Sequence, residues 1–164
     1  MQIKKPETFE ELLELQRILD ETISKPRENR FTPRHRNIYD MKMSIIAEII
    51  EFNEEKLKEE AIDILFFFLQ LINRKVSDNR DFDLSFFQWE WKHLFEDNSI
   101  IVYSDEAEMR IIKNISYDDI YRAFVNLIYL YIAYGISQDE VYSIYYEKWQ
   151  KNMERINKDW TLKK

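Results

Sequence analysis

Glycine is almost missing from this chain: it occurs once in 164 residues, beside three prolines. Tight turns between strands usually need both residues, because glycine supplies positive φ angles and proline presets the turn. Helices need neither in their interiors. The scarcity therefore predicts an all-α fold, a helical bundle of about five to six helices in a single domain over residues 1–164. Hydrophobic residues make up 45% of the chain, which is enough for a sizeable core.

The composition also limits which partners the protein can bind and where in the cell it can work. The chain has no cysteine, so it can form neither a disulfide nor a thiolate metal site. Its formal net charge of −7 disfavours non-specific binding to nucleic acid. The first residues hold no apolar signal region, and there is no uncharged apolar run of the ~18 residues that a membrane span needs. We expect a cytoplasmic protein that binds neither nucleic acid nor a membrane.

Three capping patterns predict where helices begin. Each places a Ser or Thr three positions before an acidic residue, which satisfies free backbone N–H groups of a first turn. The patterns are Thr8–Glu11, Ser116–Asp119 and Ser137–Glu140. The first predicts a helix that runs to about residue 23. The second predicts a helix that ends at Gly135, and the third predicts a helix over about 139–158. Two more helices, about 38–55 and 57–75, are joined so closely that they should run antiparallel as neighbours.

Residues 77–114 are read as an insertion between the third helix and the C-terminal helix pair. Their aromatic residues suggest an amphipathic helix, and they favour packing on the bundle or on a partner chain over stacking on bases. Those residues are Phe82, Phe86, Phe87, Trp89, Trp91 and Phe95. The β-prone stretch Ser99–Tyr103 predicts a small hairpin with Met109–Ile112.

Two carboxylate pairs stand out on the second and third predicted helices. Glu48/Glu51 and Glu60/Asp63 are each spaced i, i+3, so both members of a pair share one helix face. Apolar residues surround Glu48 and Asp63, which predicts buried helices and buried charges. A buried carboxylate is costly unless it is paired or binds a metal, and hard divalent cations prefer carboxylate oxygens. We therefore expect one Mg²⁺ or Mn²⁺ site. The alternative is a solvated acidic face, which is favoured for Glu54, Glu55 and Glu59.

Cationic and amide side chains form candidate ligand contacts elsewhere. On the last helix a stripe at i, i+3, i+7 and i+10 suits phosphate oxygens, although an ordinary solvated stripe has the same pattern. The stripe consists of Tyr145, Lys148, Asn152 and Arg155. The basic segment Lys25–Asn37 is either a solvated loop or a lid over an anionic ligand. Gln16, an amide among apolar neighbours, is either a partner for core backbone groups or a ligand contact.

These features together resemble the dimeric, all-α dUTPases of the all-α nucleoside triphosphate pyrophosphohydrolase superfamily. The segment that ends at Gln16 resembles the family's Leu-x-x-x-Gln. The two acid pairs resemble its ExxE…ExxD metal motif. The stripe from Tyr145 to Arg155 resembles its YxxKNxxNxxR. The resemblance spans about Leu12 to Trp160.

The resemblance implies a homodimer that hydrolyses dUTP to dUMP and pyrophosphate. It implies that Mg²⁺ is held by the four acids, with Glu48 or Glu51 as the catalytic base. It implies that Gln16 bonds the uracil edge and that Phe67 packs near the deoxyribose. Phosphates would be held by Lys148, Asn152 and Arg155.

The chain also departs from the family pattern. Eight residues separate Glu51 from Glu60, where many members carry a longer loop. Trp149, Ile156 and Asp159-Trp160 replace the usual Asn, Gln and Gly-Tyr. Two alternatives therefore stand beside dUTP hydrolysis: a house-cleaning pyrophosphohydrolase for another nucleoside triphosphate, and a non-catalytic helical interaction protein.

Overall fold

The computed structural model describes residues 3–24, 36–97 and 104–158. They form helices α1 (Phe9–Ser24), α2 (Ile38–Glu55), α3 (Lys58–Asp78), α4 (Leu84–Leu94), α5 (Ser104–Ser116), α6 (Ile120–Ala133) and α7 (Gln138–Lys158). No strand occurs among the described residues, so the all-α prediction is confirmed. Their seven helices exceed the predicted five to six.

The amphipathic helix predicted within residues 77–114 is α4, and the unexpected helix is α5. The predicted hairpin is wrong, because Met109–Ile112 lie inside α5. The buried residues Ala107, Ile111 and Ile115 recur every fourth position, which is the period of a helix face rather than of a strand. Residues 98–103, which hold the other half of that predicted hairpin, lie outside the described residues.

The helix starts are correct at two of the three predicted caps. The side chains of Thr8 and Ser137 accept hydrogen bonds from backbone N–H groups three residues on, at 3.1 Å each. Ser116 is not a cap: it is the last residue of α5, and the N-cap of α6 is Asp119, which accepts from the Arg122 backbone N–H. The helix before Gly135 ends as predicted, with that glycine at φ 70°.

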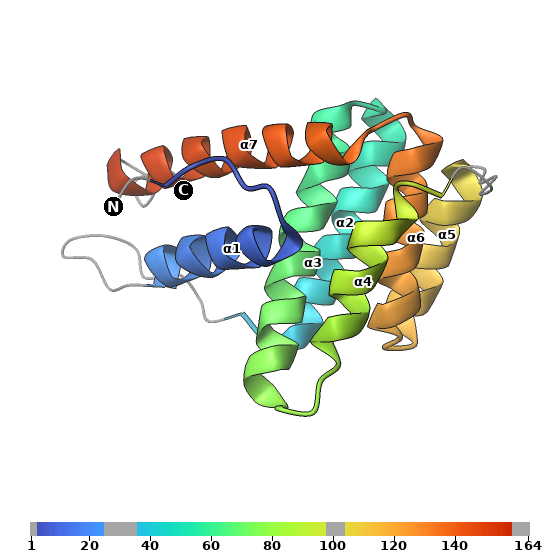
Figure 1. Cartoon of the computed structure of the whole chain (residues 1–164), viewed down its shortest axis with the longest axis horizontal. Coiled ribbons are helices and arrows are strands. Elements are labelled where there is room, and N and C mark those ends of the chain that lie inside the picture. Colours follow the sequence, from blue (N-terminus) through green and yellow to red (C-terminus); the bar gives the residue numbers. More distant parts are fainter. Residues whose placement is uncertain (1–2, 25–35, 98–103, 159–164) are drawn as a thin grey trace.

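Helices α2 to α6 run side by side, and α1 and α7 cross them and extend together to one side of the molecule (Figure 1). A buried aromatic cluster joins α4 to α1 and α6: Phe9, Phe87, Trp91 and Phe124 have ring centroids 5.0–6.1 Å apart. The indole of Trp91 also donates to the Tyr142 hydroxyl on α7 at 2.8 Å. The aromatics of residues 77–114 therefore belong partly to the core.

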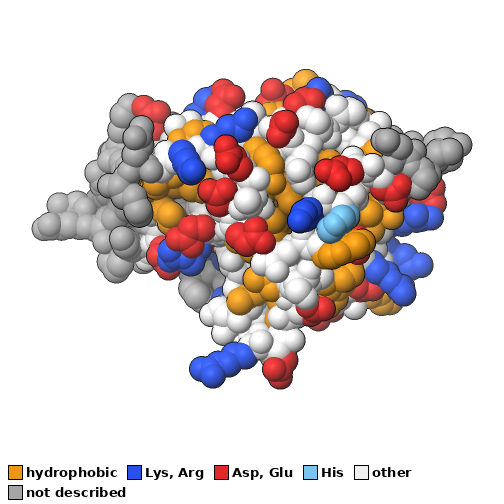
Figure 2. Space-filling view, viewed as in Figure 1, with side chains coloured by type: hydrophobic (Ala, Val, Ile, Leu, Met, Phe, Trp, Pro, Cys, Tyr) orange, Lys and Arg blue, Asp and Glu red, His pale blue; other side chains and the backbone are white. Residues whose placement is uncertain are grey.

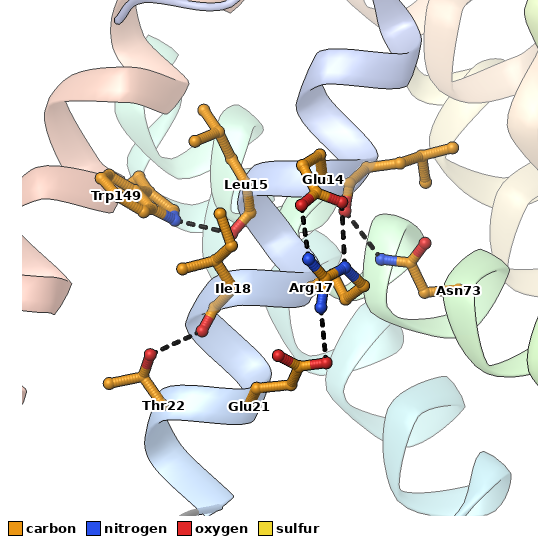
Figure 3. Close-up of polar contacts among 9 residues, drawn as sticks. Glu14, Leu15, Arg17, Ile18, Glu21, Thr22, Asn73 and Trp149 are labelled. Carbon is orange, nitrogen blue, oxygen red and sulfur yellow. Dashed lines mark hydrogen bonds and ion pairs between the residues drawn. The ribbon is translucent and has the colours of Figure 1, made fainter. Parts of the chain in front are cut away.

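Helix α1 is held by neighbours on both flanks (Figure 3). The Trp149 indole of α7 donates to the Leu15 carbonyl at 2.7 Å, and the Asn73 amide of α3 donates to the Leu13 carbonyl at 3.0 Å. Hydrogen bonds from two other helices to the backbone of α1 fix its position. Trp149, a departure from the family pattern, thus has a structural role here.

The turn between α2 and α3 sets how these helices face each other. Lys56 adopts a left-handed conformation at φ 57° and ends α2. Its Nζ donates to the Tyr134 hydroxyl at 2.8 Å and lies 3.4 Å from the buried carboxylate of Glu108. These contacts tie the turn to α5 and α6, so the two acid-bearing helices meet in a defined register.

No single described helix has the length and apolar character of a membrane span, and α6 and α7 pass that test only as a pair, with a bend of 102° between them.

Candidate functional site

Three of the four predicted acids meet at the α2–α3 interface. Glu48 and Glu51 project from α2 and Glu60 projects from α3, and one oxygen from each lies within 4.8 Å of the others. The short join makes α2 and α3 neighbours, and the i, i+3 spacing puts both α2 acids on the shared face. The group is a set of oxygen ligands of the kind a hard divalent cation requires.

The fourth acid, Asp63, is held by a cation instead. Its Oδ1 lies 2.9 Å from Nζ of Lys148, which projects from α7. The two side chains are 29% and 23% exposed, so this ion pair is only partly open to solvent. The ion pair connects the acid cluster to the stripe on the last helix.

The expectation that Glu48 and Asp63 are buried holds only in part. Glu48, Glu60 and Asp63 are partly buried, and Glu51 is exposed. Helix α2 is not buried on every side, because Met43 and Ile50 lie on its surface at 47% and 53% exposure. Part of the apolar sequence around Glu48 therefore covers an outer face. Glu54, Glu55 and Glu59 are exposed, as the solvated interpretation predicts.

Glu48 is nevertheless electrostatically strained. Its Oε2 is completely buried and has no hydrogen-bond partner among the described residues. Burial, followed by repulsion from Asp63, Glu51 and Glu60, raises the pKa of Glu48 to about 7. The pKa of Glu60 is raised to about 7, again by burial first and by its acidic neighbours second. Lys148 opposes both shifts, and a bound cation would oppose them more strongly.

A cavity of about 930 Å³ opens beside the acids, between α1, α2, α3 and α7. Glu48 and Asp63 line it, and so do three of the predicted substrate-binding residues, Gln16, Phe67 and Asn152. The volume suits a nucleotide-sized ligand. Lys148 reaches the site through Asp63, whereas Arg155 is exposed near the end of α7 and is not among the lining residues.

Gln16 is buried and fully engaged within the protein. It is 3% exposed, its Oε1 accepts from the Tyr145 hydroxyl at 2.8 Å, and its Nε2 donates to Asp20 Oδ1 at 2.9 Å. Tyr145, the first residue of the stripe, is itself fully buried and stacks on Phe66 with ring centroids 4.3 Å apart. Its hydroxyl joins α7 to α1 rather than facing solvent.

Sequence reasoning missed Asp20 and Gln70, which also line the cavity. Gln70 Nε2 donates to Asp20 Oδ1 at 3.0 Å. Burial raises the pKa of Asp20 to about 6, although the hydrogen bonds from Gln16 and Gln70 oppose the shift. The signal was present, since Asp20 lies one turn after Gln16 and Gln70 lies one turn after Phe67, on the same helix faces.

One cation of the basic segment also reaches the cavity. Arg36 lines the cavity, with its guanidinium 5.1 Å from the centroid of the Phe67 ring. Its backbone carbonyl accepts from Arg74 at 3.1 Å. Residues 25–35, which make up most of the predicted lid, lie outside the described residues.

On the outer surface acidic and basic side chains are interspersed, as the face in Figure 2 shows.

Comparison with known proteins gives one finding. A family model described as dUTPase matches residues 8–160, which is nearly the whole chain. No curated protein and no solved structure matches the chain.

Proposed function

This chain belongs to the all-α dUTPase family and is a dUTP diphosphatase, and from that premise we propose that it is a divalent-metal enzyme whose metal site is the carboxylate cluster of α2 and α3. The family favours an enzyme over a non-catalytic interaction protein. The observation that carries the metal proposal is the mutual approach of Glu48, Glu51 and Glu60 within 4.8 Å, with one buried oxygen of Glu48 left without a partner.

The residues present fit an Mg²⁺ ion. Glu48, Glu51 and Glu60 would hold it, and Asp63 would join them from the next turn of α3. A divalent ion here would neutralise phosphate charge and lower the pKa of a water molecule. The raised pKa values of Glu48 and Glu60 support this assignment, because burial first and acidic neighbours second disfavour the charged carboxylates, and a cation would offset both effects. Mn²⁺ has the same ligand preferences.

Hydrolysis of dUTP needs one water molecule and yields dUMP and pyrophosphate. The water oxygen adds to a phosphorus atom beside the α–β bridging oxygen, and the bond between that phosphorus and the bridge breaks. The proton of the water passes to a carboxylate, for which Glu48 and Glu51 are the candidates. The bridging oxygen leaves with the departing phosphate group.

The cavity supports a substrate orientation with its phosphates beside the acids. Asn152 lines the cavity and Lys148 lies against Asp63, so both can approach phosphate oxygens. Arg155, near the end of α7, is the third proposed phosphate-binding side chain. Phe67 lies farther along the wall, where its ring can pack against the deoxyribose and leave little space for a 2′-hydroxyl.

We also propose a homodimer, as the resemblance implies. Helix α2 carries an exposed apolar stripe of Tyr39, Met43 and Ile50, which are 68%, 47% and 53% exposed. Their spacing of i, i+4 and i+11 places them on one side of the helix. A second copy of the chain would bury this stripe, which is otherwise a costly apolar surface.

The test is pyrophosphate release. The purified protein is incubated with dUTP and with each of the four standard deoxynucleoside triphosphates, with Mg²⁺, with Mn²⁺ and with a chelator. We expect dUTP turnover with either metal and none with the chelator. Turnover that persists in the chelator would refute the metal proposal. A clear preference for another nucleotide would contradict dUTP as the substrate.

A further inference from the structure

The turn between α2 and α3 lies close to two of the metal-ligand candidates. Only Lys56 and Leu57 lie between the last residue of α2 and the first residue of α3. Glu51 is five residues before Lys56 and Glu60 is four residues after it. Along the two helix axes these separations are about 6–8 Å. A change in the backbone angles of so short a turn therefore moves the two acids relative to each other.

The backbone of the turn has a conformation that its residue disfavours. Lys56 has φ 57° and ψ 29°, which is the left-handed region. A residue with a Cβ adopts this region at a cost, and glycine or asparagine is the usual residue at such a helix end. The backbone N–H of Lys56 donates to the Phe52 carbonyl at 2.7 Å, but a glycine could make the same bond. The contacts of the lysine side chain are what offset the cost here.

That side chain joins the turn to three parts of the bundle. Lys56 Nζ donates to Asn53 Oδ1 on α2 at 2.7 Å and to the Tyr134 hydroxyl, just after α6, at 2.8 Å. It also lies 3.4 Å from Glu108 Oε1 on α5. The Tyr134 hydroxyl donates to the same Glu108 oxygen at 3.3 Å, and the Tyr134 ring packs edge-on against Phe52. Although burial acts to lower it, the contacts with Tyr134 and Glu108 raise the pKa of Lys56, so the side chain stays charged.

Glu108 is the fixed end of this set of contacts. Its side chain is buried, with 5% of the residue exposed, and helix α5, which carries it, packs on both α2 and α6. A buried carboxylate is costly without a cation. Glu108 therefore needs the Lys56 ammonium group as much as the turn needs Glu108. The position of the turn is thus set by α5 and α6 rather than by the two turn residues alone.

We propose that Lys56, held by Glu108 and Tyr134, is a positioning residue for the metal site and adapts that site to a small cation such as Mg²⁺. Its Nζ is turned toward α5 and α6, so it acts through the backbone of the turn and not on the metal itself. It fixes how far Glu51 on α2 lies from Glu60 on α3. This inference rests on the proposed function, because it takes the carboxylate cluster as the metal site.

The size of the cation makes the positioning measurable. Mg²⁺ requires near-octahedral geometry with oxygen ligands at about 2.0–2.1 Å, whereas Ca²⁺ accepts a flexible set of ligands at about 2.3–2.6 Å. If the turn is no longer held, Glu51 and Glu60 can move apart by a fraction of an ångström. Mg²⁺ binding is sensitive to that movement and Ca²⁺ binding tolerates it. Loss of the Lys56 contacts should therefore weaken Mg²⁺ binding more than Ca²⁺ binding.

Metal binding tests the inference without requiring turnover. Dissociation constants of Mg²⁺ and Ca²⁺ are measured by displacement of Mn²⁺, which is followed by the electron paramagnetic resonance of the free ion. Lys56→Met is combined with Glu108→Gln, so that the contact is lost without leaving a buried charge alone. Lys56→Arg is the conservative variant. Lys151→Met is the matched control, because Lys151 is an exposed lysine that pairs with Glu147 along α7.

Helical circular dichroism and thermal denaturation without metal confirm that each variant folds. If the combination with Lys56→Met does not fold, Lys56→Gly with Glu108→Gln takes its place. Glycine relieves the left-handed strain at this position while it removes every contact of the side chain. The second combination therefore separates the positioning of the acids from the stability of the turn.

We expect the native protein to bind Mg²⁺, and the combined variant to bind it at least about tenfold more weakly. The dissociation constant of Ca²⁺ should change by less than about twofold, because its ligands need less exact placement. In Lys56→Arg and Lys151→Met both constants should stay within about twofold of the native values, since the first keeps a cation beside Glu108 and the second leaves the turn intact. A role that is only structural would weaken both ions equally.

Three results would overturn the inference: equal weakening of the two ions, unchanged Mg²⁺ binding in a folded combined variant, and a native protein that binds no Mg²⁺. Failure of the proposed function gives a different result. In that case dUTP turnover persists with a chelator, while Mg²⁺ binding to the protein still depends on Lys56.

Discussion

Single neighbours decide how each carboxylate of the site is held. Asp63 has Lys148 at 2.9 Å, while Glu48 keeps one buried oxygen without a partner among the described residues. Asp20, outside the acid cluster, is stabilised only by amide donors and by the more distant charge of Arg36. Acids of one chemical type thus differ in the partners that they have and in those that they can still accept.

Asp63→Ala should abolish dUTP turnover, with a loss of at least ~100-fold, because several kcal/mol of metal-assisted stabilisation of the transition state depend on the ligand set. Helical circular dichroism should remain largely intact, since the side chain is at the edge of the cavity. Glu59→Ala is the control, because Glu59 is an exposed acid on the same helix. Unchanged turnover in Asp63→Ala would remove Asp63 from the metal site.

Asp20→Asn should stabilise the protein at neutral pH. The folded-state pKa of Asp20 is raised to about 6 from an ordinary value of 3.8. The folded protein therefore binds this proton more tightly than the unfolded chain, and stability falls as the pH rises from about 4 to 6. Above pH 6 the full cost is present, at most ~3 kcal/mol. Urea denaturation of both proteins should show this gain at pH 7.5 and little difference at pH 4. An equal difference at both pH values would contradict the assignment.

At the scale of the helix, local sequence patterns placed most boundaries. The predicted helix over 38–55 matches α2, and the caps at Thr8 and Ser137 are correct because the signals that make them are only three residues apart. The Ser116 prediction failed because Ser116 and Asp119 both offer acceptors, and the choice between them depended on where α5 ended.

The two candidate caps give a direct comparison. Asp119→Ala should lower the free energy of unfolding by ~1 kcal/mol, because the Arg122 backbone N–H loses its acceptor at the start of α6. Ser116→Ala should change it by less than ~0.5 kcal/mol, since Ser116 is an exposed residue at the end of α5. Chemical denaturation of the two variants measures both values. The reverse order would mean that Ser116 is the cap.

The candidate site was predictable only where its residues recur along one helix. Spacing and apolar neighbours predicted Glu48, Glu51, Glu60 and Asp63, and the structure brings three of them together. The pairing of Asp20 with Gln70 joins residues 50 positions apart and depends on how α1 packs on α3, which no local period records. The partial exposure of Glu48 was missed for the same reason: the apolar residues around it divide between the core and an outer stripe, and only the packed structure separates them.

At the scale of the whole molecule, that outer stripe carries the proposed dimer interface. Ile50→Glu, or Met43→Glu, should convert the proposed dimer to a monomer, because a charge would be buried at the α2 interface without a partner. Light scattering coupled to size-exclusion chromatography gives the mass. Trp89→Glu is the control, since Trp89 is 58% exposed on α4, away from the stripe. A dimer that survives both α2 substitutions would place the interface on another face.

The contact between α1 and α7 has a consequence for the protein during its synthesis. The hydrogen bonds that hold Gln16 and Leu15 come from residues 129 and 134 positions later in the chain. While the ribosome is still translating α6, the wall that carries Gln16 and Asp20 has no Tyr145 or Trp149 to hold it. The nascent chain thus contains both acid-bearing helices, α2 and α3, well before α7 can close the cavity.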